Sequence, residues 1–330
     1  MSLSWPRVHL IAARAASRMH RDLHIDTTRQ IDPFAALDTA GVLVVRRRLD
    51  RLAGLYLPAD PHDPDAVPSV LINVVHPASK QRFTAAHELG HHARDKNVSL
   101  DRDTEWLARG DAQGAERERL AEAFAAWFLM PQRLVLRLLT DLGLQADTLD
   151  ADGAYALSLS LGTSYTATVR HLADMQEIST QRSEHLLRIT PQTIKQEIGG
   201  LDVAANSWKD IHRLAVTQEE VRVTAQEGDV LLIDAPETPS SGYLWAVRTP
   251  ADGVALIRDE YRASDPDALG GRGQHRFLFR VEEAGEWDMV LELRRPWQHA
   301  AVDTARVVVI VYPQPAPGIV HPNLLVRDAA

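Results

Sequence analysis

The pentapeptide His87-Glu88-Leu89-Gly90-His91 constrains this chain more than any other feature of its sequence. Residues four apart on an α-helix lie on one face about one turn apart, so two imidazoles of this motif can bind one metal ion. Glu88 projects beside His87 and His91, where it can take a proton from a water molecule on the metal. The motif therefore predicts a helix at about residues 81–94 that carries a catalytic metal centre.

A catalytic zinc ion needs a third protein ligand and an open fourth position for water. A second helix is predicted at about residues 116–130, and Glu118 and Glu122 lie four residues apart on it. One of them can bind the metal while the other orients an imidazole. Because the chain has no cysteine, two histidines and one carboxylate are the natural donors for Zn²⁺. Glu116 is a further candidate for the third ligand.

The chemistry expected at such a site is hydrolysis. Zinc lowers the pKa of its bound water to about 7, and Glu88 then serves as general base and returns the proton to the leaving amine. A second group that stabilises the oxyanion is also expected, and the sequence offers Tyr56, His76 and Arg82 as candidates. His92 and Asp95 are expected to be surface or supporting groups.

Two separate motifs resemble those of the ImmA/IrrE metallopeptidases. They are Arg82-Phe83-Thr84-Ala85-Ala86-His87-Glu88-Leu89-Gly90-His91 and Phe124-Ala125-Ala126-Trp127-Phe128-Leu129-Met130-Pro131, and the likeness covers about residues 1–145. The resemblance implies a zincin-like fold, with a small sheet and active-site helices, and a gluzincin-like ligand set with Glu118 as the third ligand. Glu122 stands where the family has Asn or Asp, and the family pattern gives it a supporting role behind a ligand.

The same resemblance implies a substrate and a biological role. The family cleaves a helix-turn-helix repressor at a limited site, and the repressor is usually encoded nearby. Cleavage switches on stress-response or mobile-element genes. The expected partner is therefore a protein substrate that itself regulates transcription.

Composition excludes several other classes of protein. The formal net charge of −9 gives no whole-chain basic footprint for nucleic acid and leaves only a local basic face open, and the absence of cysteine excludes disulfides and thiol nucleophiles. The chain contains no stretch of 18 apolar residues, which is about the length that a membrane-spanning helix needs. Pro6, Arg7 and Arg14 interrupt any apolar signal segment. The chain is expected to be soluble and cytoplasmic, with no membrane partner.

The middle segment resembles a helix-turn-helix. A helix around residues 154–161, a turn at Gly162-Thr163-Ser164 and a second helix from Tyr165 are predicted, with Ser or Thr capping the second helix. From Ser160 to Gly200, four basic residues are balanced by four acidic ones. Because DNA affinity depends on positive charge, this balance favours a packing or substrate-docking role over DNA binding.

The chain becomes β-rich from about residue 216. Seven short runs of Val, Ile, Leu, Tyr and Trp are separated by Gly, Pro and Asp, which predicts an all-β sandwich. The expected strands are 216–223, 230–233, 243–248, 254–258, 274–281, 286–293 and 305–312.

Three loop motifs in this region resemble the inhibitory loops of the chagasin family, which are immunoglobulin-like inhibitors of papain-type cysteine peptidases. The motifs are Thr238-Pro239-Ser240-Ser241-Gly242-Tyr243-Leu244-Trp245, Leu269-Gly270-Gly271-Arg272-Gly273 and Arg294-Arg295-Pro296-Trp297. Thr238 replaces the usual Asn, and Arg272 replaces a Gly. Residues expected to contact a partner are Gly242, Tyr243, Arg272, Pro296 and Trp297, whereas Trp245 is expected in the core.

Together these features predict a multidomain α+β protein. The expected parts are a metallopeptidase domain at 1–144, a helical domain at 145–205, a chagasin-like sandwich at 206–314 and a loosely ordered tail at 315–330. The main hypothesis is a zinc endopeptidase whose C-terminal domain recognises a partner or regulates the enzyme. The alternative is a chagasin-like binding or sensor protein, with a papain-type peptidase as partner and an inactive peptidase half.

Overall fold

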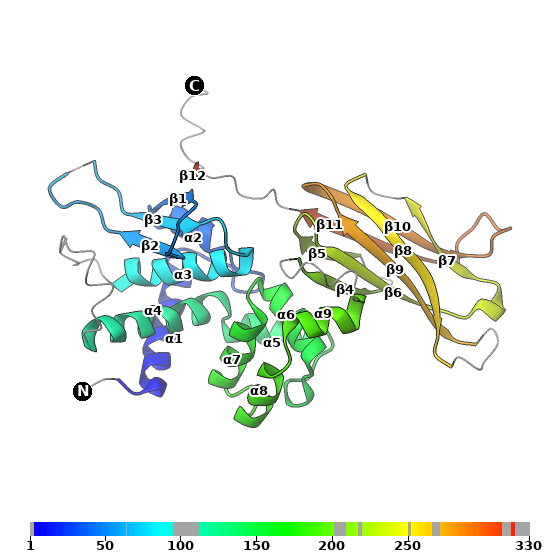
Figure 1. Cartoon of the computed structure of the whole chain (residues 1–330), viewed down its shortest axis with the longest axis horizontal. Helices are drawn as coiled ribbons and strands as arrows, with labels where there is room; N and C mark the ends of the chain where they lie inside the picture. Colours follow the sequence, from blue (N-terminus) through cyan, green and yellow to red (C-terminus); the bar gives the residue numbers. More distant parts are fainter. Residues whose placement is uncertain are drawn as a thin grey trace, which may run out of the picture. The chain divides into compact units, whose positions relative to one another are not determined.

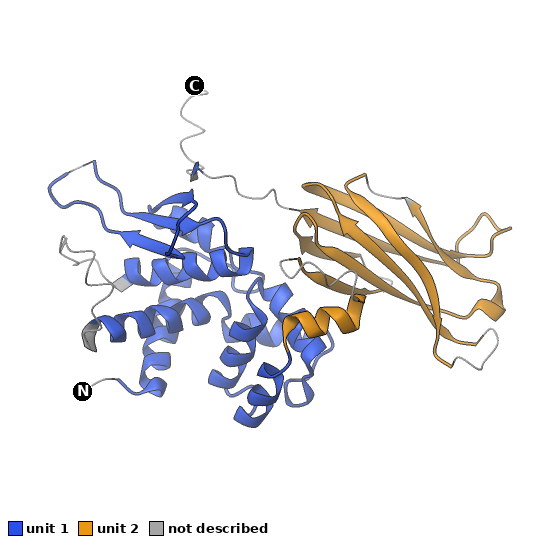
Figure 2. Cartoon of the chain, viewed as in Figure 1, with its two compact units in different colours: residues 1–189, 315–330 blue, residues 190–314 orange. Residues whose placement is uncertain are grey.

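A computed structural model describes residues 3–63, 65–94, 112–200, 209–216, 220–249, 252–265, 271–311 and 318–320. The chain divides into two compact units (Figures 1 and 2). Unit 1 comprises residues 1–189 and 315–330, and unit 2 comprises residues 190–314. Among the described residues, no helix combines the length and apolar character that crossing a bilayer requires.

Unit 1 is built from helices and one small sheet. Its four-stranded sheet has the order β12-β1-β3-β2, in which β3 runs parallel to β1 and antiparallel to β2. Helix α3 packs against β2 and β3 and also against α4, and α4 in turn packs on α1 (Figure 1). The elements are α1 Trp5–Asp22, α2 Pro33–Thr39, β1 Leu43–Arg47, β2 Gly54–Leu57, β3 Ser69–Asn73, α3 Ala78–Arg94, α4 Ala112–Leu129, α5 Gln132–Asp141, α6 Ala151–Leu161, α7 Tyr165–Asp174, α8 Thr180–Leu187 and β12 Gly318–Val320.

The two helices expected to carry the metal ligands are present as α3 and α4. Helix α4 ends at Leu129, just before Pro131, whose ring cannot continue a helix. Met130, Leu129 and Phe128 at this end are fully buried. The end of α4 is therefore anchored in the core, and this fixes the rest of the helix relative to α3.

The two helices and the intervening turn expected in the middle segment are present as α6 and α7. Gly162 ends α6 in the left-handed conformation with φ of +66°, and the Ser164 hydroxyl caps α7 by accepting from the Ala167 N–H. This segment belongs to unit 1. Arg82 of α3 donates to the Gly162 carbonyl, and His171 of α7 bonds the Met130 carbonyl. Such contacts explain why α6 to α8 share a unit with the predicted metal-binding helices.

The last described residues of the chain form a strand. Residues 318–320 were expected in a loosely ordered tail, but their backbone pairs antiparallel with β1 as β12. The open edge of β1 offers unpaired N–H and C=O groups, which a returning segment can satisfy. The remaining tail residues lie outside the described part of the chain.

Unit 2 contains two four-stranded sheets that share one core. The sheet orders are β5-β11-β10-β7 and β4-β6-β9-β8, and apolar residues from both sheets bury each other between them. The elements are α9 Pro191–Gly199, β4 Ile211–Ala215, β5 Val221–Ala225, β6 Val230–Glu237, β7 Leu244–Thr249, β8 Val254–Ala263, β9 Gly273–Val281, β10 Gly285–Arg294 and β11 Asp303–Val311. The described residues thus form mixed α+β units, as expected.

The first predicted strand of this region, 216–223, agrees with the structure in part, because Val221 to Val223 belong to β5, and residues 217–219 lie outside the described part of the chain. The sequence did not predict β4, which ends at Ala215 and lies in the other sheet. His212 and Arg213 interrupt the apolar run of β4, so the pattern of the sequence hides this strand. The β4 strand gains its place by pairing parallel with β6.

Candidate functional site

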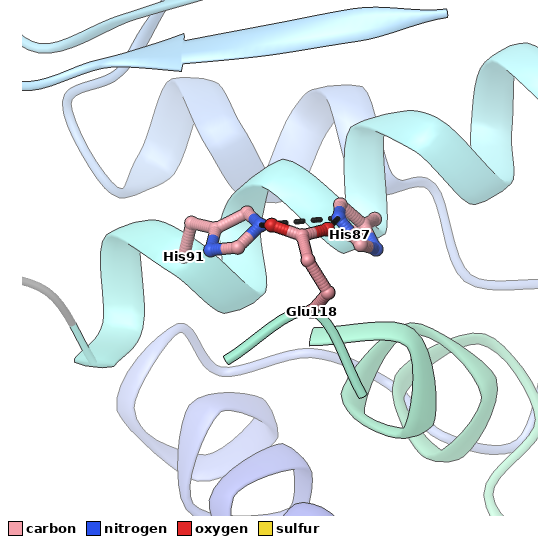
Figure 3. Close-up of side chains that lie close together, drawn as sticks. All are labelled: His87, His91 and Glu118. Carbon is pink, nitrogen blue, oxygen red and sulfur yellow. Dashed lines mark hydrogen bonds and ion pairs between the residues drawn. The ribbon is translucent and has the colours of Figure 1, made fainter. Parts of the chain in front are cut away.

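Three predicted ligands meet between α3 and α4 (Figure 3). One carboxylate oxygen of Glu118 lies 3.2 Å from His87 Nε2, and the other lies 3.4 Å from His91 Nε2. The two Nε2 atoms are 3.0 Å apart, and one ligand atom from each residue falls within 4.8 Å of the others. The sequence motif supplies the two imidazoles on one helix face, and the packing of α4 on α3 supplies the carboxylate.

The glycine of the motif allows this packing. A Cβ atom at Gly90 would lie 2.9 Å from the Phe124 ring and 3.4 Å from the Ala121 Cα. Any larger residue would push α4 away from α3. Because Glu118 lies between one and two turns before Phe124 on α4, the close approach at Gly90 helps to bring its carboxylate to the imidazoles.

The electrostatics of the site differ between its two carboxylates. Hydrogen bonds from His87 and His91 hold the pKa of Glu118 far below its usual range. Glu88 is only 7% exposed, and this burial raises the pKa of its carboxyl group. A strongly ionised carboxylate is suited to binding a cation, and a buried carboxylate with a raised pKa is suited to carrying a proton.

The donor set fits a divalent transition metal. Two imidazole nitrogens and one carboxylate converge, and the 50% exposure of the Glu118 side chain leaves the site open to solvent on one side. Closed structural zinc sites instead use four protein ligands. Among the described residues, this is the one group of three or more His, Cys, Asp or Glu side chains close enough to share an ion.

Glu122 and Glu116 lie on the same helix as Glu118. Glu122 follows Glu118 by about one turn, and Glu116 precedes it by about half a turn. Glu122 is exposed. Burial raises the pKa of Asp174 on α7, and the charge of Glu122 adds a smaller effect in the same direction. The supporting role expected for Glu122 stays a prediction.

The three oxyanion candidates occupy different places. The Tyr56 hydroxyl lies 2.9 Å from His92 Nδ1, next to the predicted ligand His91. Arg82 instead bonds the carbonyls of Gly162 and Ile31, which is a structural use of its guanidinium. Burial lowers the pKa of His76, which follows β3. Asp95 lies outside the described residues.

The three predicted loops of unit 2 lie at one end of the paired sheets. The register places Glu237 opposite Gly273 and Arg294 opposite Leu244, so the loops after β6, β8 and β10 leave from the same end (Figure 1). Leu269 and Gly270 of the second loop lie outside the described residues. Arg272 is exposed in the remaining part of that loop.

Two of the loops are joined by an arginine that the sequence reasoning did not single out. The Arg295 guanidinium lies 4.5 Å from the Tyr243 ring centre and 6.0 Å from that of Trp297, and it donates to the Ser241 carbonyl. Such stacking of a cation on two rings is favourable and restricts all three side chains. Trp297 remains 70% exposed and Pro296 is exposed, whereas Trp245 is 3% exposed, as expected.

A buried carboxylate closes the base of the first loop. Glu237 accepts from the Trp245 backbone N–H at 2.6 Å and contacts His275 Nδ1 at 2.9 Å, and its side chain is 1% exposed. Gly242 turns the loop with φ of +76°, a conformation that favours glycine. The sequence pattern predicts a turn at Gly242, whereas the partners of Glu237 become visible only in the folded structure.

Comparison with known protein families agrees with both resemblances. Residues 37–151 match the family described as IrrE N-terminal-like domain, and residues 224–311 match the chagasin family peptidase inhibitor I42. The chain therefore carries an IrrE-like domain and a chagasin-family domain. The IrrE-like match includes all three residues of the candidate metal centre, and the chagasin-family match includes all three loops.

Solved structures similar to parts of the chain include an inhibitor of cysteine proteases and a regulator of transcription. The cysteine protease inhibitor EhICP2 from Entamoeba histolytica is 21% identical with a TM-score of 0.29, covering 32% of this chain and 97% of its own. PbICP-C, solved in complex with falcipain-2, is 17% identical with a TM-score of 0.27, covering 31% of this chain and 99% of its own. A Mycobacterium tuberculosis transcriptional regulator is 14% identical with a TM-score of 0.36, covering 82% of this chain and 76% of its own. No curated protein matches the chain.

Proposed function

We propose that the chain is a zinc-dependent endopeptidase that cleaves a protein substrate at a limited site. The observation that carries this proposal is the convergence of His87, His91 and Glu118 beside the buried Glu88, within the IrrE-like domain. The IrrE-like domain is proposed to be zincin-like, with α3 and α4 as active-site helices. The side chains present suit zinc better than a hard cation such as Mg²⁺, which prefers oxygen ligands alone.

In this proposal, the chain's own residues bind the metal and move one proton. The imidazoles of His87 and His91 and the carboxylate of Glu118 would hold the ion. Bound zinc would supply Lewis acidity toward the scissile carbonyl and the attacking water. The Glu88 carboxylate takes the proton of that water and delivers it to the leaving amine, and its raised pKa brings it closer to the operating pH.

The substrate that we propose is a helix-turn-helix repressor encoded near this chain. Support comes from the IrrE-like match and from the resemblance of both active-site motifs to the ImmA/IrrE metallopeptidases. Cleavage would connect the enzyme to a stress response and to control of transcription in the cytoplasm. We propose that Glu122 supports a ligand from the same helix as Glu118.

A direct test is incubation of the neighbouring helix-turn-helix protein with the zinc-loaded chain, followed by mass spectrometry of the products. We expect one or a few cuts by the wild type and none by Glu88→Gln, which is isosteric but cannot accept the proton. Metal analysis accompanies the assay. Binding below one zinc per chain that is unchanged by His87→Ala would contradict the proposal.

We propose that α6 and α7 form a helix-turn-helix-like module for packing or substrate docking. His171 and Thr168 of α7 are buried, so much of this helix is used inside unit 1. The balanced charge of the segment argues against DNA as its ligand. A salt-dependent gel shift by the whole chain would contradict this assignment.

The second candidate function is binding of a papain-type peptidase by the chagasin-family domain, which we propose to be immunoglobulin-like. The observation that favours it is an exposed Trp297 held beside Tyr243 and Gly242 at the loop end. Large exposed aromatic residues on rigid loops are typical binding hot spots. Since the chain has no cysteine, its own IrrE-like domain is not a target of this kind, and the loops would recognise a separate protein.

Titration of a papain-type peptidase with the whole chain tests this second function. We expect inhibition by the wild type and a loss of at least about tenfold in affinity for Trp297→Ala, as for a hot-spot residue. Val302→Ala is the control, because Val302 is also exposed and follows the same loop. No inhibition at micromolar protein would discard this candidate and leave a recruiting or gating role for the domain.

A further inference from the structure

Strand β2 and helix α3 face each other through two matching rows of residues. Gly54 and Tyr56 share one face of β2 because side chains alternate along a strand. Thr84, Glu88 and His92 follow at four-residue intervals along α3 and so lie on one side of it. Contacts from Gly54 to Thr84 and from Tyr56 to His92 show that the two rows meet.

The approach of β2 to α3 depends on the absence of a side chain at Gly54. A Cβ atom there would lie 2.3 Å from Thr84 Cγ2, 2.9 Å from the Leu71 carbonyl oxygen and 3.2 Å from Glu88 Oε1. Gly54 is not among the glycines with positive φ. The requirement for glycine here is therefore one of space and not of backbone conformation.

The close approach brings a backbone donor to the predicted general base. The Tyr56 N–H donates to the Glu88 carboxylate, and the Tyr56 hydroxyl is bound at His92 Nδ1 one turn further along α3. Glu88 is thus buried against β2 with one acceptor position fixed by the backbone. A carboxylate held in this way keeps its remaining lone pairs in a defined direction.

We propose that Gly54 and Tyr56 are positioning residues for Glu88, with the Tyr56 N–H orienting its carboxylate and Gly54 providing the space for that bond. This inference rests on the proposed peptidase function and deepens it. It also gives Tyr56 a role other than that of an oxyanion donor, because its hydroxyl anchors β2 to α3 through His92.

The first test is a rescue experiment on the cleavage of the repressor. Gly54→Ala is expected to lower kcat about 100-fold, the cost of a misplacement of about 1 Å, while zinc content stays at the wild-type level. Adding Thr84→Ser removes the methyl group nearest to the new Cβ and is expected to restore part of the loss, since the Leu71 carbonyl oxygen still lies 2.9 Å from that Cβ. Thr84→Ser alone is expected to retain wild-type kcat.

Gly143→Ala is the matched control for lost stability. Gly143 has φ of +65°, and a Cβ atom added there would meet no atom within 4 Å, so alanine strains the backbone without touching the site. We expect Gly143→Ala to lower the melting temperature and to leave kcat unchanged. A Gly54→Ala enzyme within threefold of wild type would overturn the proposal.

The second test needs no substrate. Hydrogen exchange measured by NMR should show the Tyr56 amide protected in the wild type and exchanging at least about tenfold faster in Glu88→Ala, with the β3 amides of Leu71 and Ile72 unchanged. Equal exchange of the Tyr56 amide in both proteins would overturn the proposal. A wild type that cleaves nothing would contradict the proposed function, and the exchange result would still decide whether β2 holds Glu88.

Discussion

At the scale of single residues, Glu118 illustrates how a half-exposed carboxylate can be held by two partners. Its two oxygens lie between two imidazoles, and hydrogen bonds from both depress its pKa. Glu116 lies two residues away and so points elsewhere on the helix. The choice among Glu116, Glu118 and Glu122, which the residues alone left open, follows from the direction from which α4 meets α3.

Removal of the Glu118 carboxylate should therefore weaken metal binding selectively. Glu118→Ala is expected to lower zinc affinity by more than about 100-fold, since even residues that only support a ligand contribute 10- to 100-fold. Competition with a chromophoric chelator measures the affinity. Glu116→Ala is the control, and an equal loss in that variant would contradict the assignment of the third ligand.

His171 makes stability depend on pH. Burial lowers its pKa from 6.5 to about 4, and its Nε2 bonds the Met130 carbonyl. Between these two pH values the unfolded chain binds a proton that the folded chain does not, so the free energy of unfolding falls as the pH falls. From pH 7 to pH 5 this loss is about 2 kcal/mol for a shift of this size.

The variant His171→Phe tests this effect. Phenylalanine keeps a ring against Trp127, which packs edge-on to the imidazole, and has no titrating group. Urea unfolding at pH 7 and pH 5 should show a smaller drop for the variant than for the wild type. A residual drop is expected from His20, whose pKa burial also lowers. Equal drops in both proteins would contradict the prediction.

At the scale of elements, the contact of α3 with α4 decides the candidate site. The Phe124 ring packs so close to Gly90 that a Cβ atom on residue 90 would lie 2.9 Å from it. The rings of Phe124 and Phe128, both on α4, stack on each other in the core. Helix–helix distance is set by the side chains at the contact. A small change at Gly90 is therefore transmitted to the position of Glu118.

Gly90→Ala should destabilise unit 1 although alanine favours helix. Overpacking of the core is expected to cost about 1–3 kcal/mol, more than the gain of roughly 1 kcal/mol from helix propensity. Zinc affinity should fall as α4 moves. Phe124→Leu in the same chain relieves the overlap and should recover part of both losses, whereas no change in either quantity would contradict this account of the packing.

Element prediction succeeded where the pattern was local. The HExxH helix and the turn at Gly162 agree with the sequence, because helix periodicity and glycine at a left-handed position are local signals. The sequence pattern did not predict β4, because His212 and Arg213 break its apolar run and its stability comes from pairing with β6. The stacking of Arg295 on Tyr243 likewise required residues of two separate loops to meet.

At the scale of the whole molecule, the boundary between the compact units falls earlier than the sequence suggested. The sandwich was expected to begin at 206, yet α9 belongs to unit 2. Its Lys195 is buried and bonds the Lys209 carbonyl and Asp210, and Arg258 of β8 donates to the Gly199 carbonyl. A buried ammonium needs such partners, so these bonds tie the helix to the sheets.

The bonds between α9 and the sheets predict which fragment of unit 2 is the more stable. Residues 190–314 are expected to unfold cooperatively and at a higher temperature than residues 206–314, because the shorter piece loses α9 and with it the Lys195–Asp210 ion pair and the bond from Arg258 to the Gly199 carbonyl. Differential scanning calorimetry of the two fragments provides the measurement. Equal melting temperatures would favour the boundary at 206 and a separate helical domain.

The sequence by itself determined the resemblance of the two domains to their families and the two histidines of the candidate metal centre, because metal-ligand spacing on a helix and glycine-rich loop motifs are written in consecutive residues. Only the tertiary structure decided which acid meets the two imidazoles, which strand holds Glu88, and where the compact units divide. Those features depend on contacts between residues far apart in the chain, and such contacts are set by how side chains pack against one another and by which backbone groups find a partner.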